Sequence, residues 1–401
     1  FSGGSTGNSD HHSLLVTAAS AAPADSDDPC QLPTQPPDPK DSKAVAETAW
    51  KIFVAVNCPA NATQLVWETW TEQYSLYTQP GQPVGNPRRL HGSALNVILS
   101  AKAPGGAQAV ELNPATGCQK LPRPPSNMPN SKTKPSFGDF CEEVHLDPTA
   151  EAYIVQHGYQ FRVGQQQAVT TSATIQFPTT AVEVKADWFP VGDFSPPQFS
   201  CSNPTPGLHT EMIAGGCYAL VGMHISSKLL PDWLWATFEP QNRNTNPQRC
   251  STKLFGPCID RFGSSPATSK GGTTQQTPAL AALMKRARLA PEFSNYRMDG
   301  AQVEFGTTHK PTLLGNSIIE GETVPGLSKG QASCISCHSA SIINSAGIED
   351  PTKPVGPEPP LPAGYIRRDF VWSLGEACPG SVFNSNPNCL NTTAGPAPTQ
   401  K

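Results

Sequence analysis

The amino-acid sequence predicts an α+β protein, in which a disulfide-stapled, β-rich body packs against a mostly helical segment. Residues 41–57 repeat apolar side chains at helical spacing, whereas residues 181–188 alternate apolar and charged side chains as a half-buried strand does. Charged residues make up only 15% of the 401, and 43 residues are proline. Twelve cysteines can supply the cross-links that such a loop-rich chain needs.

Composition divides the chain into three parts. Residues 1–40 are small, polar and proline-rich, and they predict an arm that packs along its own body or joins subunits in a homo-oligomer. The strand-rich body is expected over residues 41–275, and the second segment over residues 276–401. A net charge of −4 without a basic cluster gives no nucleic-acid signal. The most apolar stretch, residues 212–223, is too short for a membrane span.

Two helices have clear start signals. Asp41 or Ser42 can cap the helix predicted over residues 41–57, and Thr277-Pro278 combines an N-cap with proline at the first helical position. Between them, the stretch LVWETWTEQYSLY places aromatic residues at helical spacing. This stripe predicts a helix that faces the core through Trp67, Trp70, Tyr74 and Tyr77.

The middle of the chain is rich in strand signals. The alternation in AVEVKADW (residues 181–188) predicts antiparallel pairing with one face open to water. Further strands are expected at TTSATIQF (170–177), LHGSALNVILSAKA (90–103), CYALVGMHI (217–225) and WLWATFE (233–239).

Cysteine usage indicates an oxidising compartment. Ten cysteines remain when the pair at 334 and 337 is set aside, and the simplest arrangement pairs neighbours in order, although sequence alone leaves the connectivity open. A chain that begins with Phe1 also fits a processed export whose signal peptide has been removed. We therefore expect a periplasmic or extracellular protein. The ten are Cys30, Cys58, Cys118, Cys141, Cys201, Cys217, Cys250, Cys258, Cys378 and Cys389.

Cys334-Ile335-Ser336-Cys337-His338 spells C-x-x-C-H, the pattern that attaches haem c covalently. Two thiols three positions apart reach the two vinyl groups of one porphyrin, and His338 is then close enough to ligate the iron. A zinc site would need a second close Cys/His pair, and a redox-active C-x-x-C would need a strand-to-helix context. The single motif predicts one covalent haem c.

The sixth iron ligand is open at this point, because no Met or His follows His338. His224 lies in the apolar strand predicted at 217–225, either as a hydrogen-bonded core histidine or as a second metal ligand. Met298, His309 and an open or water-bound iron are the alternatives.

Three further charged positions have simpler interpretations. His145 stands among acids in CEEVHLD, which predicts a solvated face. Arg367 and Arg368 are predicted as surface charges, with partners for haem propionates as the alternative.

Five stretches together resemble large secreted bacterial proteins of the cytochrome c family, over about residues 180–340. They are VEVKADW, YALVGMHI, WLWATFE, PTLLGNSIIE and SCISCH. The resemblance implies an exported mono-haem protein and brings no firmly known activity. The missing downstream Met departs from small soluble cytochromes, so their His/Met ligation cannot simply be transferred.

The expected function is periplasmic or extracellular electron transfer, with a redox partner protein or a small-molecule oxidant or reductant. One alternative is a haem-dependent oxidoreductase of peroxidase or oxygenase type with an exchangeable distal site. Another is a subunit of an oligomer or filament joined through the arm.

Overall fold

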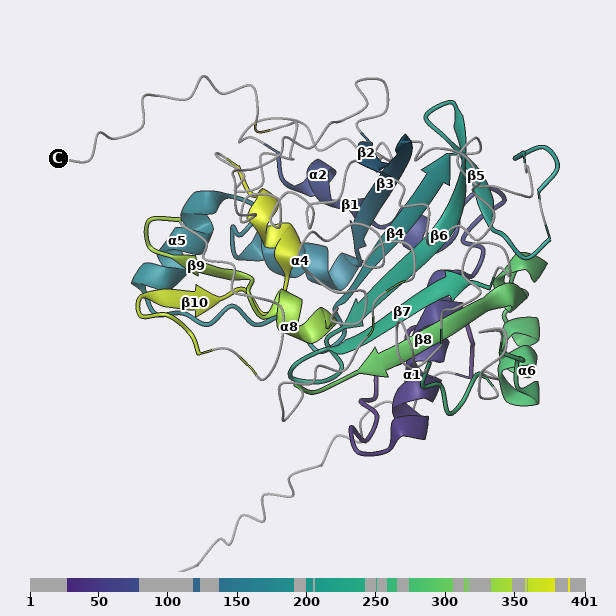
Figure 1. Ribbon diagram of the computed structural model, residues 1–401. Coiled ribbons are helices and arrows are strands. Elements are labelled where there is room, and N and C mark those ends of the chain that lie inside the picture. Colours follow the sequence, from purple (N-terminus) through teal and green to yellow (C-terminus); the bar gives the residue numbers. More distant parts are fainter. Residues whose placement is uncertain are drawn as a thin grey trace, which may run out of the picture.

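The computed structural model centres on one antiparallel sheet (Figure 1). It describes residues 27–78, 118–122, 137–190, 200–204, 206–241, 250, 258–264, 274–305, 314, 316, 333–347, 358, 360–378 and 389. Within these residues eight strands form the sheet, in the order β1-β3-β4-β6-β7-β8, with β2 beside β3 and β5 beside β6. The strands are β1 (Thr71–Glu72), β2 (Gln119–Pro122), β3 (Phe137–Leu146), β4 (Val182–Pro190), β5 (Thr210–Ile213), β6 (Gly216–Ser227), β7 (Leu234–Pro240) and β8 (Tyr296–Gln302).

The central strands follow the sequence pattern. Predictions at 181–188, 217–225 and 233–239 are confirmed as β4, β6 and β7, and all pairs are antiparallel. Residues 170–177 are not a strand, because they form the end of α5 (Arg162–Thr170) and the irregular chain after it. The prediction at 90–103 lies outside the described residues. β8 pairs with β7, so residues 296–302 share the sheet with the preceding body.

Two capped helices cover one face of the sheet. Asp41 caps α1 (Ser42–Val56) through its carboxylate, and Thr277 caps α6 (Pro278–Arg286) through its hydroxyl, as predicted. Both helices pack in an apolar core against β4, β6, β7 and β8 (Figure 1). Trp50 and Phe53 of α1 contact Phe238 of β7 inside this core.

The aromatic stripe after α1 is buried as predicted, but it is not one helix. The chain instead forms the short 3-10 helix η1 (Trp67–Thr69), β1 and α2 (Gln73–Leu76). Glu72 ends the extended stretch and caps α2, because its carboxylate accepts hydrogen bonds from the backbone N–H groups of Tyr74 and Ser75. A capping side chain and strand pairing therefore override the helical spacing.

The second face of the sheet is covered, which corrects the prediction of a face open to water. Asp187 and Thr237 on this face are fully buried. One reason is that the 3-10 helix η4 (Trp372–Glu376) packs against it, where Ser373 donates to the Glu183 carboxylate (3.1 Å). Three further elements gather on this side (Figure 1): α4 (Pro148–Gln156), α5 and α8 (Cys334–His338).

The segment that carries the motif is less helical than predicted in its described part. After β8 it holds the five-residue α8, the paired strands β9 (Ile342–Asn344) and β10 (Tyr365–Arg367), and η4. Before β8 it holds α6 and the 3-10 helix η3 (Pro291–Asn295). The described chain is thus α+β throughout.

All ten cysteines outside the motif form disulfides, and they pair with their neighbours in order. The bridges are Cys30–Cys58, Cys118–Cys141, Cys201–Cys217, Cys250–Cys258 and Cys378–Cys389. Five disulfides are typical of a protein outside the cytoplasm. The first ties the end of the predicted arm to the body, whereas residues 1–26 lie outside the described part. No helix in the described ranges is long and apolar enough to cross a bilayer.

Candidate functional site

The two motif cysteines lie on α8, one helical turn apart, and take part in none of the five disulfides. Gln302 at the end of β8 fixes the start of this helix. Its side-chain oxygen accepts a hydrogen bond from the Ile335 backbone N–H (3.1 Å), and its amide donates to Ser333 Oγ (3.0 Å). Ile335 is fully buried and therefore anchors the helix in the core. Both thiols come from the single turn of this short helix.

The imidazole of His338 is oriented by a backbone carbonyl. His338 Nδ1 lies 2.7 Å from the Phe370 oxygen, so Nδ1 carries the proton that it donates, and Nε2 keeps its lone pair. The pKa of His338 is lowered to about 4, because burial and, to a smaller extent, the Lys185 charge outweigh the opposing hydrogen bond to Phe370. The ring is therefore neutral at neutral pH, which is the form that binds a metal.

The carbonyl is presented by a turn with unusual backbone geometry. Asp369 and Phe370 both have positive φ (51° and 69°), a conformation that non-glycine residues adopt only where their surroundings impose it. The Asp369 carboxylate pairs with Lys228 Nζ (2.6 Å) and accepts a hydrogen bond from the Phe177 backbone N–H (2.7 Å). This buried ion pair joins the end of β6 to the turn and holds the Phe370 carbonyl against the imidazole.

His224 lies over the same patch of the sheet as His338. The His338 ring contacts Trp235 of β7, with 4.4 Å between ring centroids. His224 lies on the neighbouring strand β6, where it pairs with Thr237 of β7. Since Thr237 is two positions from Trp235, the side chains of His224 and Trp235 are diagonal neighbours about 7–8 Å apart. Thr237 Oγ1 lies 3.1 Å from His224 Nδ1. Burial, Lys185 and His338 together lower the pKa of His224 well below its ordinary range.

The other ligand candidates fall elsewhere. Met298 is fully buried in the core beneath α1, on the opposite face of the sheet from Trp235. His309 lies outside the described residues. His145 is fully buried rather than solvated, because its ring is held between the Trp70 carbonyl and the Glu143 carboxylate (3.1 Å each).

The two arginines after β9 differ from each other. Arg368 is fully buried, which corrects its prediction as a surface charge, because its side chain is enclosed where the turn after β10 packs on the body. Burial also lowers its pKa. Arg367 is partly exposed and reaches two groups, the Glu358 carboxylate (2.9 Å) and the Ser339 carbonyl (3.0 Å) beside the motif helix.

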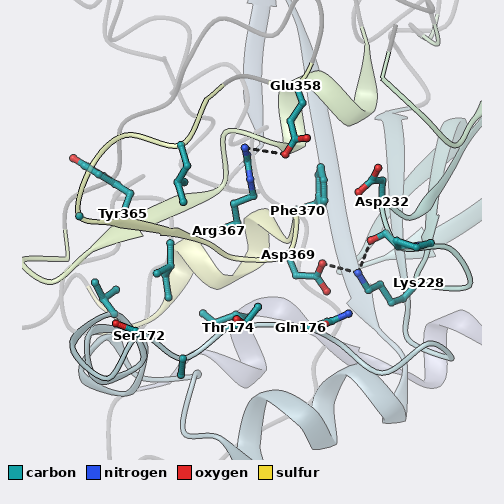
Figure 2. Close-up of a pocket in the computed structure, with 17 residues that line it drawn as sticks. Ser172, Thr174, Gln176, Lys228, Asp232, Glu358, Tyr365, Arg367, Asp369 and Phe370 are labelled. Atoms are coloured by element: carbon teal, nitrogen blue, oxygen red, sulfur yellow. Dashed lines mark hydrogen bonds and ion pairs between the residues drawn. The ribbon is translucent and has the colours of Figure 1, made fainter. Parts of the chain in front are cut away.

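A cavity of about 490 Å³ is lined in part by Asp369 and Phe370 of this turn (Figure 2). Lys228 and Asp232 line one part of it, and Tyr365 lines another (Figure 2). The Phe370 side chain forms part of the wall, while its carbonyl holds His338. A molecule bound here would therefore touch the residue that orients the motif imidazole.

The donor set fits haem c attachment. A pair of thiols outside disulfides, followed directly by a neutral imidazole with one nitrogen anchored, supplies the two thioether positions and one axial ligand.

No family model, curated protein or solved structure matches this chain. Function has to be inferred from the side chains themselves. Sequence reasoning identified the motif and His224 but not the Lys228–Asp369–Phe370 support. No signal marks that support in the sequence, since Lys228 and Asp369 are 141 residues apart.

Proposed function

We propose that the chain is a mono-haem c-type cytochrome that transfers electrons outside the cytoplasm. Cys334 and Cys337 would hold the porphyrin through thioethers, and His338 would ligate the iron. The observation that carries this proposal is the His338 Nδ1 hydrogen bond to the Phe370 carbonyl at 2.7 Å. Such a bond fixes the tautomer and ring orientation of a metal-bound histidine and leaves Nε2 for the metal. The bound haem would supply a one-electron couple.

His224 is the proposed sixth ligand, because it lies over the same part of the sheet as His338. The Nδ1 atom of His224 lies within hydrogen-bonding distance of Thr237 Oγ1. The lowered pKa of His224 keeps its ring neutral. A bis-imidazole site closes the iron and suits a carrier that exchanges only electrons. The resemblance to secreted cytochromes c belongs to the same proposal, as does a redox partner protein or a small-molecule oxidant or reductant.

An absorption spectrum of the haem-loaded chain, with and without CO, tests this proposal. We expect a low-spin spectrum that CO does not change in the wild type. His224→Ala should give a high-spin spectrum that shifts on CO addition, whereas Thr237→Val should stay low-spin, because it removes only the hydrogen bond. A wild-type spectrum that is already high-spin and binds CO would refute His224 as a ligand.

A haem-dependent oxidoreductase is the second candidate function, and the cavity behind Phe370 favours it. Its wall combines apolar side chains with the Lys228–Asp369 and Arg367–Glu358 ion pairs. In this alternative His224 would act as a distal hydrogen-bonding group over an exchangeable iron position. Peroxide turnover that is lost in His224→Ala would support it, and an iron closed to CO and cyanide would exclude it.

A further inference from the structure

A second group of metal-binding side chains lies away from the haem motif, where three segments meet. Glu68 comes from η1, His209 from the residue just before β5, Glu211 from β5 itself, and Glu292 from η3. The ligand atoms of Glu68, His209 and Glu211 all lie within 4.8 Å of one another. Glu68 is more than 140 residues from His209 and Glu211 along the chain, so only the fold brings it beside them.

His209 is the centre of this cluster. Its Nε2 lies 2.7 Å from Glu211 Oε1, and its Nδ1 lies 3.1 Å from Glu292 Oε1. The ring is stacked on Phe293 (4.8 Å between centroids) and is only 8% exposed, so its orientation is fixed. His209 and Glu211 are two positions apart in extended chain, which places both side chains on the same face.

This arrangement has the form of a metal ligand with an outer carboxylate. A metal-bound histidine usually donates its second ring N–H to a carboxylate, which fixes the ring and raises its basicity. Glu292 is the carboxylate at His209 Nδ1. The other ring nitrogen, Nε2, faces the carboxylates of Glu211 and Glu68.

We propose that Glu68, His209 and Glu211 form a binding site for one divalent transition-metal ion of the Zn²⁺ type, with Glu292 as the outer partner of His209. One imidazole and two carboxylates suit Zn²⁺, whose ligand bonds are about 2.0–2.2 Å long. Ligand atoms around a tetrahedral ion lie about 3.3 Å apart, so movements of roughly 1 Å would close the site. The ion would cross-link η1 to β5, independently of the haem.

Isothermal titration of the tag-free, metal-stripped full-length chain with ZnCl₂ tests the site. We expect one Zn²⁺ per chain. The same binding should persist in Cys334→Ser/Cys337→Ser, which removes the motif thiols as competing ligands. MgCl₂ and CaCl₂ should bind far more weakly, because both prefer all-oxygen sites.

Variants separate the proposed ligands from bystanders. Glu292→Gln should weaken Zn²⁺ binding by about 10- to 100-fold, the usual effect of losing an outer-shell partner. Glu211→Gln, at a partly exposed position, should weaken it at least as much, whereas Glu47→Gln on the surface of α1 should change nothing. Equal affinity in all three variants, or no stoichiometric Zn²⁺ binding to a folded wild type, would overturn the site.

Discussion

The imidazole of His338 and the carbonyl of Phe370, 32 residues apart, meet at 2.7 Å. Neither residue could hold this geometry by itself. The paired strands β9 and β10 bring the two segments together, and the buried Lys228–Asp369 ion pair fixes the turn that carries the carbonyl. A motif that sequence identifies in five residues thus depends on support from the end of β6.

Asp369→Asn should be strongly destabilising. It removes the anion beside Lys228, whose side chain is 3% exposed, and leaves a buried charge without its partner. Breaking a buried pair in this way costs about 3–5 kcal/mol. Urea unfolding of the purified protein measures the loss. Glu47→Gln breaks the exposed Glu47–Lys51 pair as a control and should cost less than about 0.5 kcal/mol. Similar losses in both variants would contradict a supporting role for Asp369.

Lys185→Gln should lower the midpoint potential of the proposed haem. The Lys185 charge acts on both His224 and His338, and a positive charge near the iron favours the reduced form. Lys185 also lies 3.5 Å from Glu142 Oε2, so its removal leaves a more negative environment. A redox titration followed by visible absorption gives the potential. Lys51→Gln, at an exposed position, should leave it unchanged, and an unchanged or higher potential in Lys185→Gln would count against the proposed haem position.

The contributions of Glu72 and Glu183 to stability should fall as pH rises from 5 to 8. Burial raises the pKa of Glu72 from 4.5 to about 7, and it does the same for Glu183. A carboxyl with a higher pKa in the folded state binds its proton more tightly there. Its contribution is complete below the unfolded pKa near 4.5 and is lost as pH rises through about 7.

Glu72→Gln should therefore remove the part of the pH dependence that Glu72 contributes, so that the stability of the variant falls less steeply with pH than that of the wild type. For one fully buried carboxyl the loss is of the order of 1–3 kcal/mol. Urea unfolding at pH 5, 6, 7 and 8 measures it, with Glu47→Gln as the control that keeps the wild-type slope. Parallel curves for wild type and Glu72→Gln would show that Glu72 is ionised throughout.

The Cys30–Cys58 bridge should stabilise the body. Its cysteines are 28 positions apart, and Cys58 is fully buried at the end of α1. Cys30→Ser/Cys58→Ser should lower the free energy of unfolding by about 2–4 kcal/mol. Thermal unfolding under oxidising conditions checks this. No change in the melting temperature would mean that the fold holds this segment without the disulfide.

Local signals in the sequence predicted much of the fold. Capping at Asp41 and Thr277 and the alternation in β4 correctly identified elements, because these signals act within a few residues. The in-order disulfides were likewise the simplest arrangement. The prediction of a solvent-exposed sheet face was wrong, because segments distant in sequence, such as η4, cover β4. The prediction of one helix over the aromatic stripe was wrong, because Glu72 interrupts it and caps a separate helix, α2.

The candidate site was predictable only in part. The C-x-x-C-H motif is local, and His224 stood out as a polar residue in an apolar strand. The Phe370 carbonyl is a backbone group that no sequence pattern marks. His209 gave no signal either, because its neighbours Glu68 and Glu292 are 141 and 83 positions away.

The mass of the full-length chain, expressed with haem c maturation in the periplasm, tests the central claim most directly. Covalent haem at Cys334 and Cys337 predicts a gain of about 616 Da, no titratable thiol in denaturant, and loss of the gain in Cys334→Ser/Cys337→Ser. A wild-type chain of unmodified mass, with both thiols still titratable or joined to each other, would contradict it.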